Sequence, residues 1–193
     1  MSLRFETLTG AEVEARLDAL AALRIEVFRD WPYLYDGDLA YERRYMASYQ
    51  GSPRAILVGA FAGEALVGAA TGTPMEDHAE DFAAAFAGRD LTEIFYCAES
   101  VLLPEHRGQG AGHAFFDARE AHARALGRRY SAFCAVERPA DHPLRPEGYR
   151  PLDPFWRARG YAPLPGAAAT FHWKDVDKAA ETDHRLHVWM KSL

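Results

Sequence analysis

The most constraining feature of the chain is a glycine-rich turn, Arg107-Gly108-Gln109-Gly110-Ala111-Gly112, between a strand-like and a helix-like segment. The apolar run 94–103 precedes it, and the run 113–126 that follows has helical spacing. Glycines let the backbone approach a ligand closely with its amide groups turned outward. At a helix N-terminus, unpaired amides and the helix dipole favour phosphate. Together with the positive charge of Arg107, the turn predicts a pyrophosphate-binding loop.

The spacing separates this loop from two other phosphate-binding patterns. A P-loop would continue with Lys-Ser/Thr, whereas His113-Ala114 follows here. The dinucleotide fingerprint needs Gly-x-Gly-x-x-Gly near the start of a βαβ unit. Here Leu102-Leu103-Pro104-Glu105-His106 precedes Arg-x-x-Gly-x-Gly. This arrangement resembles the acyl-CoA-binding motif of the GNAT superfamily of N-acetyltransferases, in which a hydrophobic residue, any residue, proline and two further residues precede Arg/Gln-x-x-Gly-x-Gly/Ala.

The resemblance implies that acetyl-CoA is the co-substrate. It assigns the binding of acetyl-CoA to residues close together in the sequence, namely Leu102, Leu103, Arg107, Gly108, Gln109, Gly110, Ala111, Gly112 and His113.

Length and composition narrow the class of protein. A chain of 193 residues with 49% hydrophobic residues suits one domain, 1–193, with a full core. The net charge of −6 and the pI of about 5.7 imply no strongly basic face, so nucleic acid is not an expected partner. Cys97 and Cys134 lie in apolar runs and are expected to be buried and reduced. No apolar leader and no run of ~20 apolar residues is present, so a cytoplasmic protein without membrane contact is expected.

The order of predicted elements favours an α/β fold with one mixed sheet. A capping box at Thr9 predicts a helix that ends near Asp30, and Gly127 is placed to end the helix 113–126. The other predicted helices are 39–49, 76–87 and 152–159, and the predicted strands are 3–8, 55–61, 65–71, 92–103, 130–136, 168–173 and 186–191.

Apart from the helix at 76–87, this is the element order of the GNAT fold. The resemblance therefore implies a mixed central β-sheet flanked by helices, in which the splayed parallel strands 94–103 and 130–136 form the acyl-CoA cleft. The helix at 76–87 is interpreted as either a lid over the cleft or a dimer contact, and a homodimer stays open.

Catalytic groups are expected along the strand before the glycine loop. By resemblance, one backbone amide of Leu102 or Leu103 polarises the thioester carbonyl, an oxyanion-type role. The attacking amine must be neutral, so a general base is also expected. Glu99 is the first candidate because it is the only carboxylate in 94–103. A structural Glu99 bonded to an arginine is the alternative, and Glu93 is the second candidate base.

The leaving thiolate marks a departure from the family pattern. Many family members have a tyrosine in a pattern like Tyr-x-x-x-Gly-Phe, and Trp156 stands at that position in Trp156-Arg157-Ala158-Arg159-Gly160-Tyr161. An indole N–H is not a general acid of that kind. Either Tyr149 or Tyr161 replaces the tyrosine, or the thiolate leaves unaided.

Two segments are candidates for acceptor recognition. Residues 137–151 form a proline-rich stretch without helical or strand pattern, and connections of this length are usually functional or disordered. The arginines in it favour a carboxylate on the acceptor. The second segment is the aromatic loop 31–35, which by resemblance borders the acceptor site. The candidate acceptor-binding residues are Trp31, Tyr33, Tyr35, Arg138, His142, Arg145 and Arg150. The histidines are scattered, so no metal site is predicted.

The sequence therefore predicts an N-acetyltransferase that moves an acetyl group from acetyl-CoA to a primary amine of a small molecule or peptide. Two alternatives stay open. A non-catalytic acyl-CoA-binding or sensing module would be consistent with Trp156, and a nucleotide-binding domain is disfavoured by the absent Lys-Ser/Thr.

Overall fold

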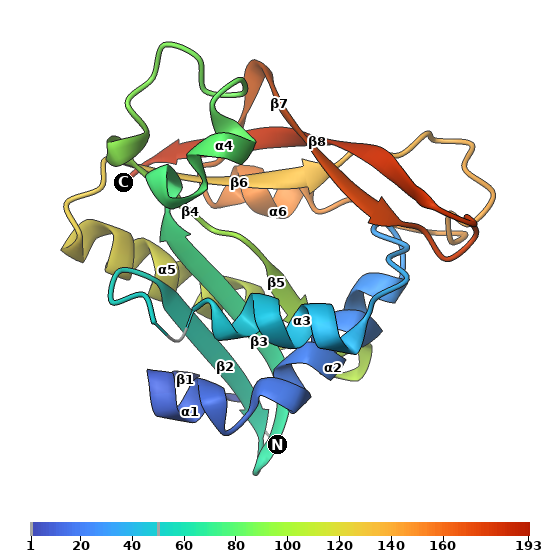
Figure 1. Cartoon of the computed structure of the whole chain (residues 1–193), viewed down its shortest axis with the longest axis horizontal. Coiled ribbons are helices and arrows are strands. Elements are labelled where there is room, and N and C mark those ends of the chain that lie inside the picture. Colours follow the sequence, from blue (N-terminus) through green and yellow to red (C-terminus); the bar gives the residue numbers. More distant parts are fainter. Residues whose placement is uncertain (1, 50) are drawn as a thin grey trace.

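The computed structural model describes residues 2–49 and 51–193. Its strands form a sheet with the order β1-β2-β3-β4-β6-β8-β7, while β5 pairs with β3 alone (Figure 1). Only β4 and β6 run parallel among the described pairs, which confirms the predicted mixed sheet. The strands are β1 (Arg4–Thr7), β2 (Ile56–Ala62), β3 (Ala65–Pro74), β4 (Ile94–Tyr96), β5 (Ser100–Leu102), β6 (Tyr130–Val136), β7 (Ala162–Lys174) and β8 (Glu181–Ser192).

Helices cover both faces of the sheet. The helices are α1 (Gly10–Glu14), α2 (Leu17–Arg29), α3 (Leu39–Ala47), α4 (Ala79–Phe82), α5 (Ala111–Ala125) and α6 (Asp153–Ala158), with 3-10 turns η1 (Met75–His78), η2 (Leu91–Glu93) and η3 (Pro104–His106). None of the helices in the described parts of the chain has the length and apolar character needed to cross a bilayer.

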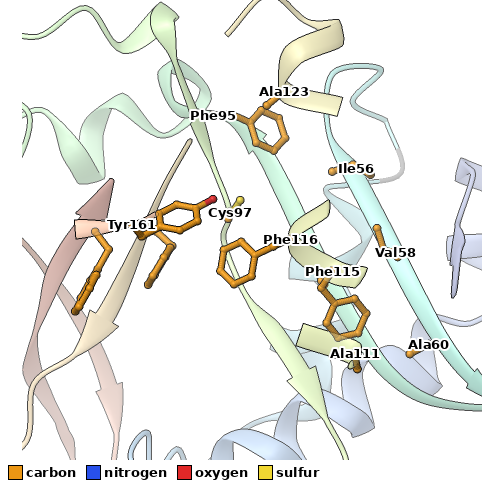
Figure 2. Packing of buried hydrophobic residues seen from close by; sticks show 13 residues of the cluster. Ile56, Val58, Ala60, Phe95, Cys97, Ala111, Phe115, Phe116, Ala123 and Tyr161 are labelled. Carbon is orange, nitrogen blue, oxygen red and sulfur yellow. The ribbon is translucent and has the colours of Figure 1, made fainter. Parts of the chain in front are cut away.

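Strand β2 shows why two helical layers are needed. Its side chains alternate between the faces, as expected for a strand. Val58 and Ala60 pack in the same cluster as Phe115 of α5, and Figure 2 shows them together. Leu57 instead packs with Leu20 of α2 on the opposite face. Because both faces of β2 are apolar, neither face is left to solvent.

The prediction of one continuous helix from Thr9 to Asp30 is wrong, because the segment forms two helices. Thr9 caps α1 as expected, with its amide donating to Glu12 over 2.8 Å. The chain then breaks after Glu14, and α2 begins at Leu17. The break keeps Val13 and Leu20 in one buried cluster under the sheet.

The predicted helix at 76–87 is also wrong in extent. Only Ala79–Phe82 is α-helical, after the 3-10 turn η1. The segment is held by packing, since Phe82 is buried with its ring centroid 4.7 Å from that of Tyr96 and 5.7 Å from that of Phe171. It therefore covers the face of β4 and β7.

The remaining strand boundaries follow from pairing rather than from local pattern. β7 and β8 extend well beyond the predicted 168–173 and 186–191, and the register between them shifts between Pro163 and Ala168. An apolar alternation marks only the buried part of a strand, so the exposed ends of this pair carry no signal in the sequence.

Candidate active site

A β-bulge divides the predicted strand 92–103 into β4 and β5. The amide of Ala98 donates to the carbonyl of Thr71 over 3.1 Å, and the amide of Thr71 donates to the carbonyl of Glu99 over 3.1 Å. Two residues on one strand thus face one residue on the other, which is the definition of a bulge. Bulges bend the strand that contains the extra residue. The sequence prediction of one strand is therefore wrong at this point.

The bend opens a gap between β5 and β6. Strand β4 pairs with β6 in parallel up to Tyr96, and the amide of Cys97 still donates to the carbonyl of Ala132 over 2.8 Å. Beyond it, β5 pairs only with β3. The splayed strands that the resemblance implied are present.

A single cavity of about 1490 Å³ occupies this gap and continues on both sides of it. Ligand pockets are typically ~300–1,000 Å³, so the cavity has room for a long co-substrate together with an acceptor. Its wall includes Gly108 and Gly110 of the glycine loop, Glu99 of the bulge, and Trp31 and Tyr149 of the two candidate acceptor segments.

The glycine loop has the conformation that a phosphate cradle requires. Gly108 and Gly110 have φ angles of 76° and 83°, and Gly110 is the N-cap of α5. A side chain at either position would be strained, because L-residues rarely adopt positive φ. A Cβ built at either one meets no atom within 4 Å, so the space in front of the loop is open. The loop therefore fits the pyrophosphate of an acyl-CoA.

Arg107, Ala111, Gly112 and His113 also lie on the cavity wall, as predicted. Gln109 is exposed and lies outside it, so its predicted place in the binding site rests on backbone alone. The helix that follows ends as predicted, with Gly127 at a φ of 72°.

The backbone amides of the two leucines that precede the loop point in different directions. The amide of Leu103 donates to the carbonyl of Val67 over 3.0 Å, so of the two candidate amides only that of Leu102 is left for a thioester. Ladder bonds alternate along an antiparallel pair, so the amide of Leu102 points to the opposite edge of β5. That edge faces the cavity. The carbonyl of Leu102 points the same way and accepts from Nε of Arg107 over 3.3 Å.

Glu99 lies on the cavity wall, with its side chain one-tenth exposed. Nη1 of Arg24 lies 2.5 Å from its Oε1, and the hydroxyl of Tyr45 donates to its Oε2 over 3.0 Å. The carboxylate is thus both bonded to an arginine and open to the cavity. The second candidate, Glu93, lies at the strand start in an ion pair with Arg129 and does not line the cavity.

The candidate acceptor residues do not all reach the cavity. Trp31, Tyr33, Arg138, Arg145 and Arg150 line it. Tyr35 does not, because it packs against the cluster under α2 and α3 and pairs with Asp175. Its predicted role is therefore not supported by its position.

His142 and Arg138 hold other parts of the wall in place. The ring of His142 packs 5.2 Å from that of Trp31, so it stands behind the wall. The guanidinium of Arg138 is engaged in hydrogen bonds within the fold. Its Nη1 and Nη2 donate to the carboxylate of Asp175 over 2.6 and 2.8 Å, and its Nε donates to the carbonyl of Pro32 over 2.8 Å. Arg138 lies on the cavity wall, but these bonds engage its guanidinium within the fold, so its contacts do not support the predicted role in acceptor binding.

The sequence profile of the acetyltransferase (GNAT) family matches residues 20–145. The chain belongs to the GNAT acetyltransferase family. No curated protein matches the sequence. Family membership makes the protein an acyltransferase with acetyl-CoA as its co-substrate.

Solved structures share the GNAT fold at low sequence identity. The ribosomal-protein-alanine N-acetyltransferase of Brucella melitensis has a TM-score of 0.63 and 14% identity, over 98% of this chain and 99% of that chain. The PaiA N-acetyltransferase of Thermoplasma acidophilum, in complex with coenzyme A, has a TM-score of 0.55 and 11% identity over 100% of both chains. YncA of Salmonella typhimurium, with its cofactor acetyl-CoA, has a TM-score of 0.58 and 12% identity over 100% of this chain and 95% of that chain.

Trp156, at the tyrosine position of the GNAT pattern, packs among other aromatic side chains. The ring of Trp156 packs 4.9 Å from that of Phe133 and 5.1 Å from that of Trp189. Tyr161 is buried behind this layer, where its hydroxyl donates to Glu120 over 3.1 Å. Tyr161 does not line the cavity, whereas Tyr149 does.

Sequence reasoning missed two buried arginines of this GNAT site. Arg24 lies four residues after Leu20 and four before Phe28, on the buried stripe of α2. Arg119 lies on the buried stripe of α5, four residues after Phe115. An arginine inside an apolar stripe is a readable signal, because a buried charge needs a partner.

Proposed function

We propose that the protein transfers the acetyl group of acetyl-CoA to the primary amine of a small molecule or peptide that also carries a carboxylate. The observation that carries this proposal is one cavity whose wall holds the glycine loop, the free edge of β5 and the carboxylate of Glu99. Acetyl-CoA supplies an activated acetyl thioester, and the chain has to hold it, polarise it and deprotonate the acceptor.

The donor half of the cavity is assigned to backbone groups. Amides of the turn at Gly108 and Gly110, with the charge of Arg107, suit the pyrophosphate. The amide of Leu102 points toward the gap and is available to a thioester carbonyl oxygen. Because these groups belong to the backbone, side-chain replacements at Leu102 should leave their chemistry in place.

Glu99 is assigned as the base that accepts the proton of the acceptor amine. A carboxylate offers about four lone-pair sites on two oxygens. Tyr45 donates once to Oε2 and Arg24 forms an ion pair with Oε1, so the carboxylate keeps acceptor capacity. An amine in the gap, or a water between it and Glu99, would find this carboxylate already oriented by Arg24 and Tyr45.

Tyr149 is assigned as the group that protonates the leaving thiolate. Burial raises the pKa of its phenol, and the nearby charge of Asp153 adds to that effect. The phenol therefore keeps its proton at neutral pH and remains able to donate it. Its ring lies 5.9 Å from that of Trp31, and both residues line the cavity that holds the gap between β5 and β6.

Arg145 and Arg150 are assigned to the acceptor carboxylate. Both are exposed and line the cavity, and within the described residues neither forms an ion pair with a carboxylate. Arginine is well suited to bidentate carboxylate binding. An amino-acid-like amine thus fits this part of the cavity better than a polyamine.

A thiol-release screen tests the proposed activity. The protein is incubated with acetyl-CoA and a panel of amino acids, short peptides and polyamines, and free CoA thiol is followed. Release that depends on a carboxylate-bearing amine supports the proposal. Binding of acetyl-CoA by calorimetry without release for any amine would favour the non-catalytic binding module.

The Glu99→Gln variant tests the assigned base. It keeps the shape of the side chain and removes its basicity. Loss of a positioned base typically lowers the rate by ~10² to 10⁴-fold. Full turnover in a folded Glu99→Gln protein across pH 6 to 9 would show that Glu99 is structural.

A further inference from the structure

We propose that Arg24 is a positioning residue whose guanidinium is fixed by Glu42 and in turn orients Glu99 at the cavity. The negative charge of Glu42 also weakens the effect of the positive charge of Arg24 on Glu99. This inference rests on the proposed role of Glu99 as the base. It concerns two residues that do not line the cavity themselves.

One guanidinium is divided between two buried carboxylates. Nε of Arg24 donates to Oε2 of Glu42, and Nη1 lies 2.5 Å from Oε1 of Glu99. The side chain of Glu42 is fully buried and that of Arg24 is one-tenth exposed. Arg24 also packs on two rings, with its Cζ 5.1 Å from the centroid of Phe28 and 4.4 Å from that of Tyr45. The guanidinium is thus held on several sides, and only one of its ends is directed at Glu99.

The charge of Glu42 is balanced by Arg24, and the neutral hydroxyl of Tyr35 adds a hydrogen bond. Glu42 lies on α3, outside the cavity wall, and buried carboxylates are costly unless they are paired. A single lysine-like point charge would satisfy Glu99 alone, whereas the planar fork of arginine bonds two partners in fixed directions. Glu42 therefore sets the orientation of the fork, and the fork sets the orientation of Glu99.

The groups around Glu99 leave this pair in control of its charge. Burial raises the pKa of every phenol that faces Glu99, so those phenols stay neutral. Cys134 is neutral too, because burial raises the pKa of its thiol to about 12. The facing groups are Arg24 on α2, Glu42 and Tyr45 on α3, Tyr49 after α3, Tyr33 in the aromatic loop, Tyr96 on β4, and Arg119 on α5, whose guanidinium bonds the backbone carbonyl of Glu99.

Two substitutions should then act in opposite directions. A nearby cation favours the charged form of a carboxylate and a nearby anion disfavours it. In Arg24→Met the cation is lost, so the acid limb of the kcat/KM profile should move to higher pH, by about 1 to 3 units. In Glu42→Gln the competing anion is lost while the bond to Arg24 is kept, so the acid limb should move to lower pH. A residue that only stabilises the fold would not give shifts of opposite sign.

The experiment records kcat/KM against pH for the wild type and for Glu99→Gln, Arg24→Met, Arg24→Lys and Glu42→Gln, with the acceptor that the screen returns. Thermal unfolding is followed for each variant. Arg24→Lys should keep the acid limb near its wild-type position but lower kcat, since the charge remains and the fork is lost. If Arg24→Met does not fold, Arg24→Lys and Glu42→Gln carry the test.

The outcomes distinguish a failure of this inference from a failure of the proposed role of Glu99 as the base. An acid limb that survives in Glu99→Gln overturns the assigned base, and this inference with it. An acid limb that vanishes in Glu99→Gln but keeps its position in the folded Arg24 and Glu42 variants overturns this inference alone. Shifts of opposite sign in Arg24→Met and Glu42→Gln, or a downward shift in Glu42→Gln with a slow Arg24→Lys, support it.

Discussion

The guanidinium of Arg119 donates from Nη1 to the backbone carbonyl of Glu99 over 2.9 Å. The same nitrogen donates to the carbonyl of Thr71 over 3.2 Å, and Nη2 donates to the hydroxyl of Ser100 over 2.9 Å. Both carbonyls also accept one backbone amide each at the β-bulge, so Arg119 gives each of them a second donor. A buried side chain of α5 thus adds hydrogen bonds to the strand on which the candidate base lies.

Arg119→Met should lower the free energy of unfolding by about 2 kcal/mol, because a hydrogen bond to a charged group contributes roughly 1.5–3 kcal/mol. Urea unfolding of the wild type and the variant measures the difference. Arg124→Met, on the exposed face of the same helix, is the matched control and should change stability little. An equal loss in both variants would mean that Arg119 contributes only helix packing.

Gly110→Val should abolish the binding of acetyl-CoA while the protein still folds. The substitution forces a β-branched residue into a positive φ and places its side chain in the open space before the loop. Gly88 has a φ of 79° and similarly open surroundings, but it lies outside the cavity. Gly88→Val therefore imposes the same backbone strain and should bind normally. Calorimetry with CoA decides, and unchanged affinity in a folded Gly110→Val protein would refute the assigned loop.

Arg145→Ala and Arg150→Ala should each raise the KM of the acceptor and leave the KM of acetyl-CoA unchanged. When a substitution removes a contact that stabilises the ground state and the transition state equally, KM rises and kcat is unchanged. Steady-state kinetics with both substrates varied measures this. Arg43→Ala, an exposed arginine of α3 outside the cavity, is the control. A rise in the KM of acetyl-CoA instead would place these arginines on the co-substrate.

Tyr149→Phe should lower kcat by about 10²-fold or more if the phenol is the general acid. The acid must carry its proton, and the pKa of Tyr149 is raised, so the protonated form persists to higher pH than for a free tyrosine. Wild-type kcat should therefore show no basic limb from this group below about pH 10, the ordinary value for tyrosine. A basic limb near pH 8 that persists in Tyr149→Phe would point to another proton donor.

The sequence predicted the parts of the site that local chemistry encodes. The glycine loop, the helix that follows it and the closing Gly127 all depend on residues adjacent in the chain, and each is where it was expected. The bulge at Glu99 was not predictable from the apolar run 94–103, because an extra residue in a strand leaves the run apolar. The difference between Leu102 and Leu103 was hidden too, since it depends on which amides the partner strand occupies.

The discrepancy over Arg138 has a different physical origin. Arg138 and Arg145 look alike in the sequence, and nothing within the loop distinguishes them. The partner of Arg138 is Asp175, 37 residues away, and that pairing exists only once the sheet has formed. Arginines that bind a ligand and arginines that hold a loop therefore separate only in three dimensions.

The clamp that Arg138 forms with Asp175, Pro32 and Tyr33 fixes the first residues of the loop 137–151, while Pro151 leads into α6 at its other end. Between these anchors, residues 139–150 carry few contacts that the rest of the fold requires. The co-substrate half of the cavity, in contrast, is encoded almost continuously from Cys97 to His113. If this loop reads the acceptor as we propose, selection can alter the choice of acceptor by replacing its residues other than Tyr149, while Glu99 and the glycine loop stay unchanged.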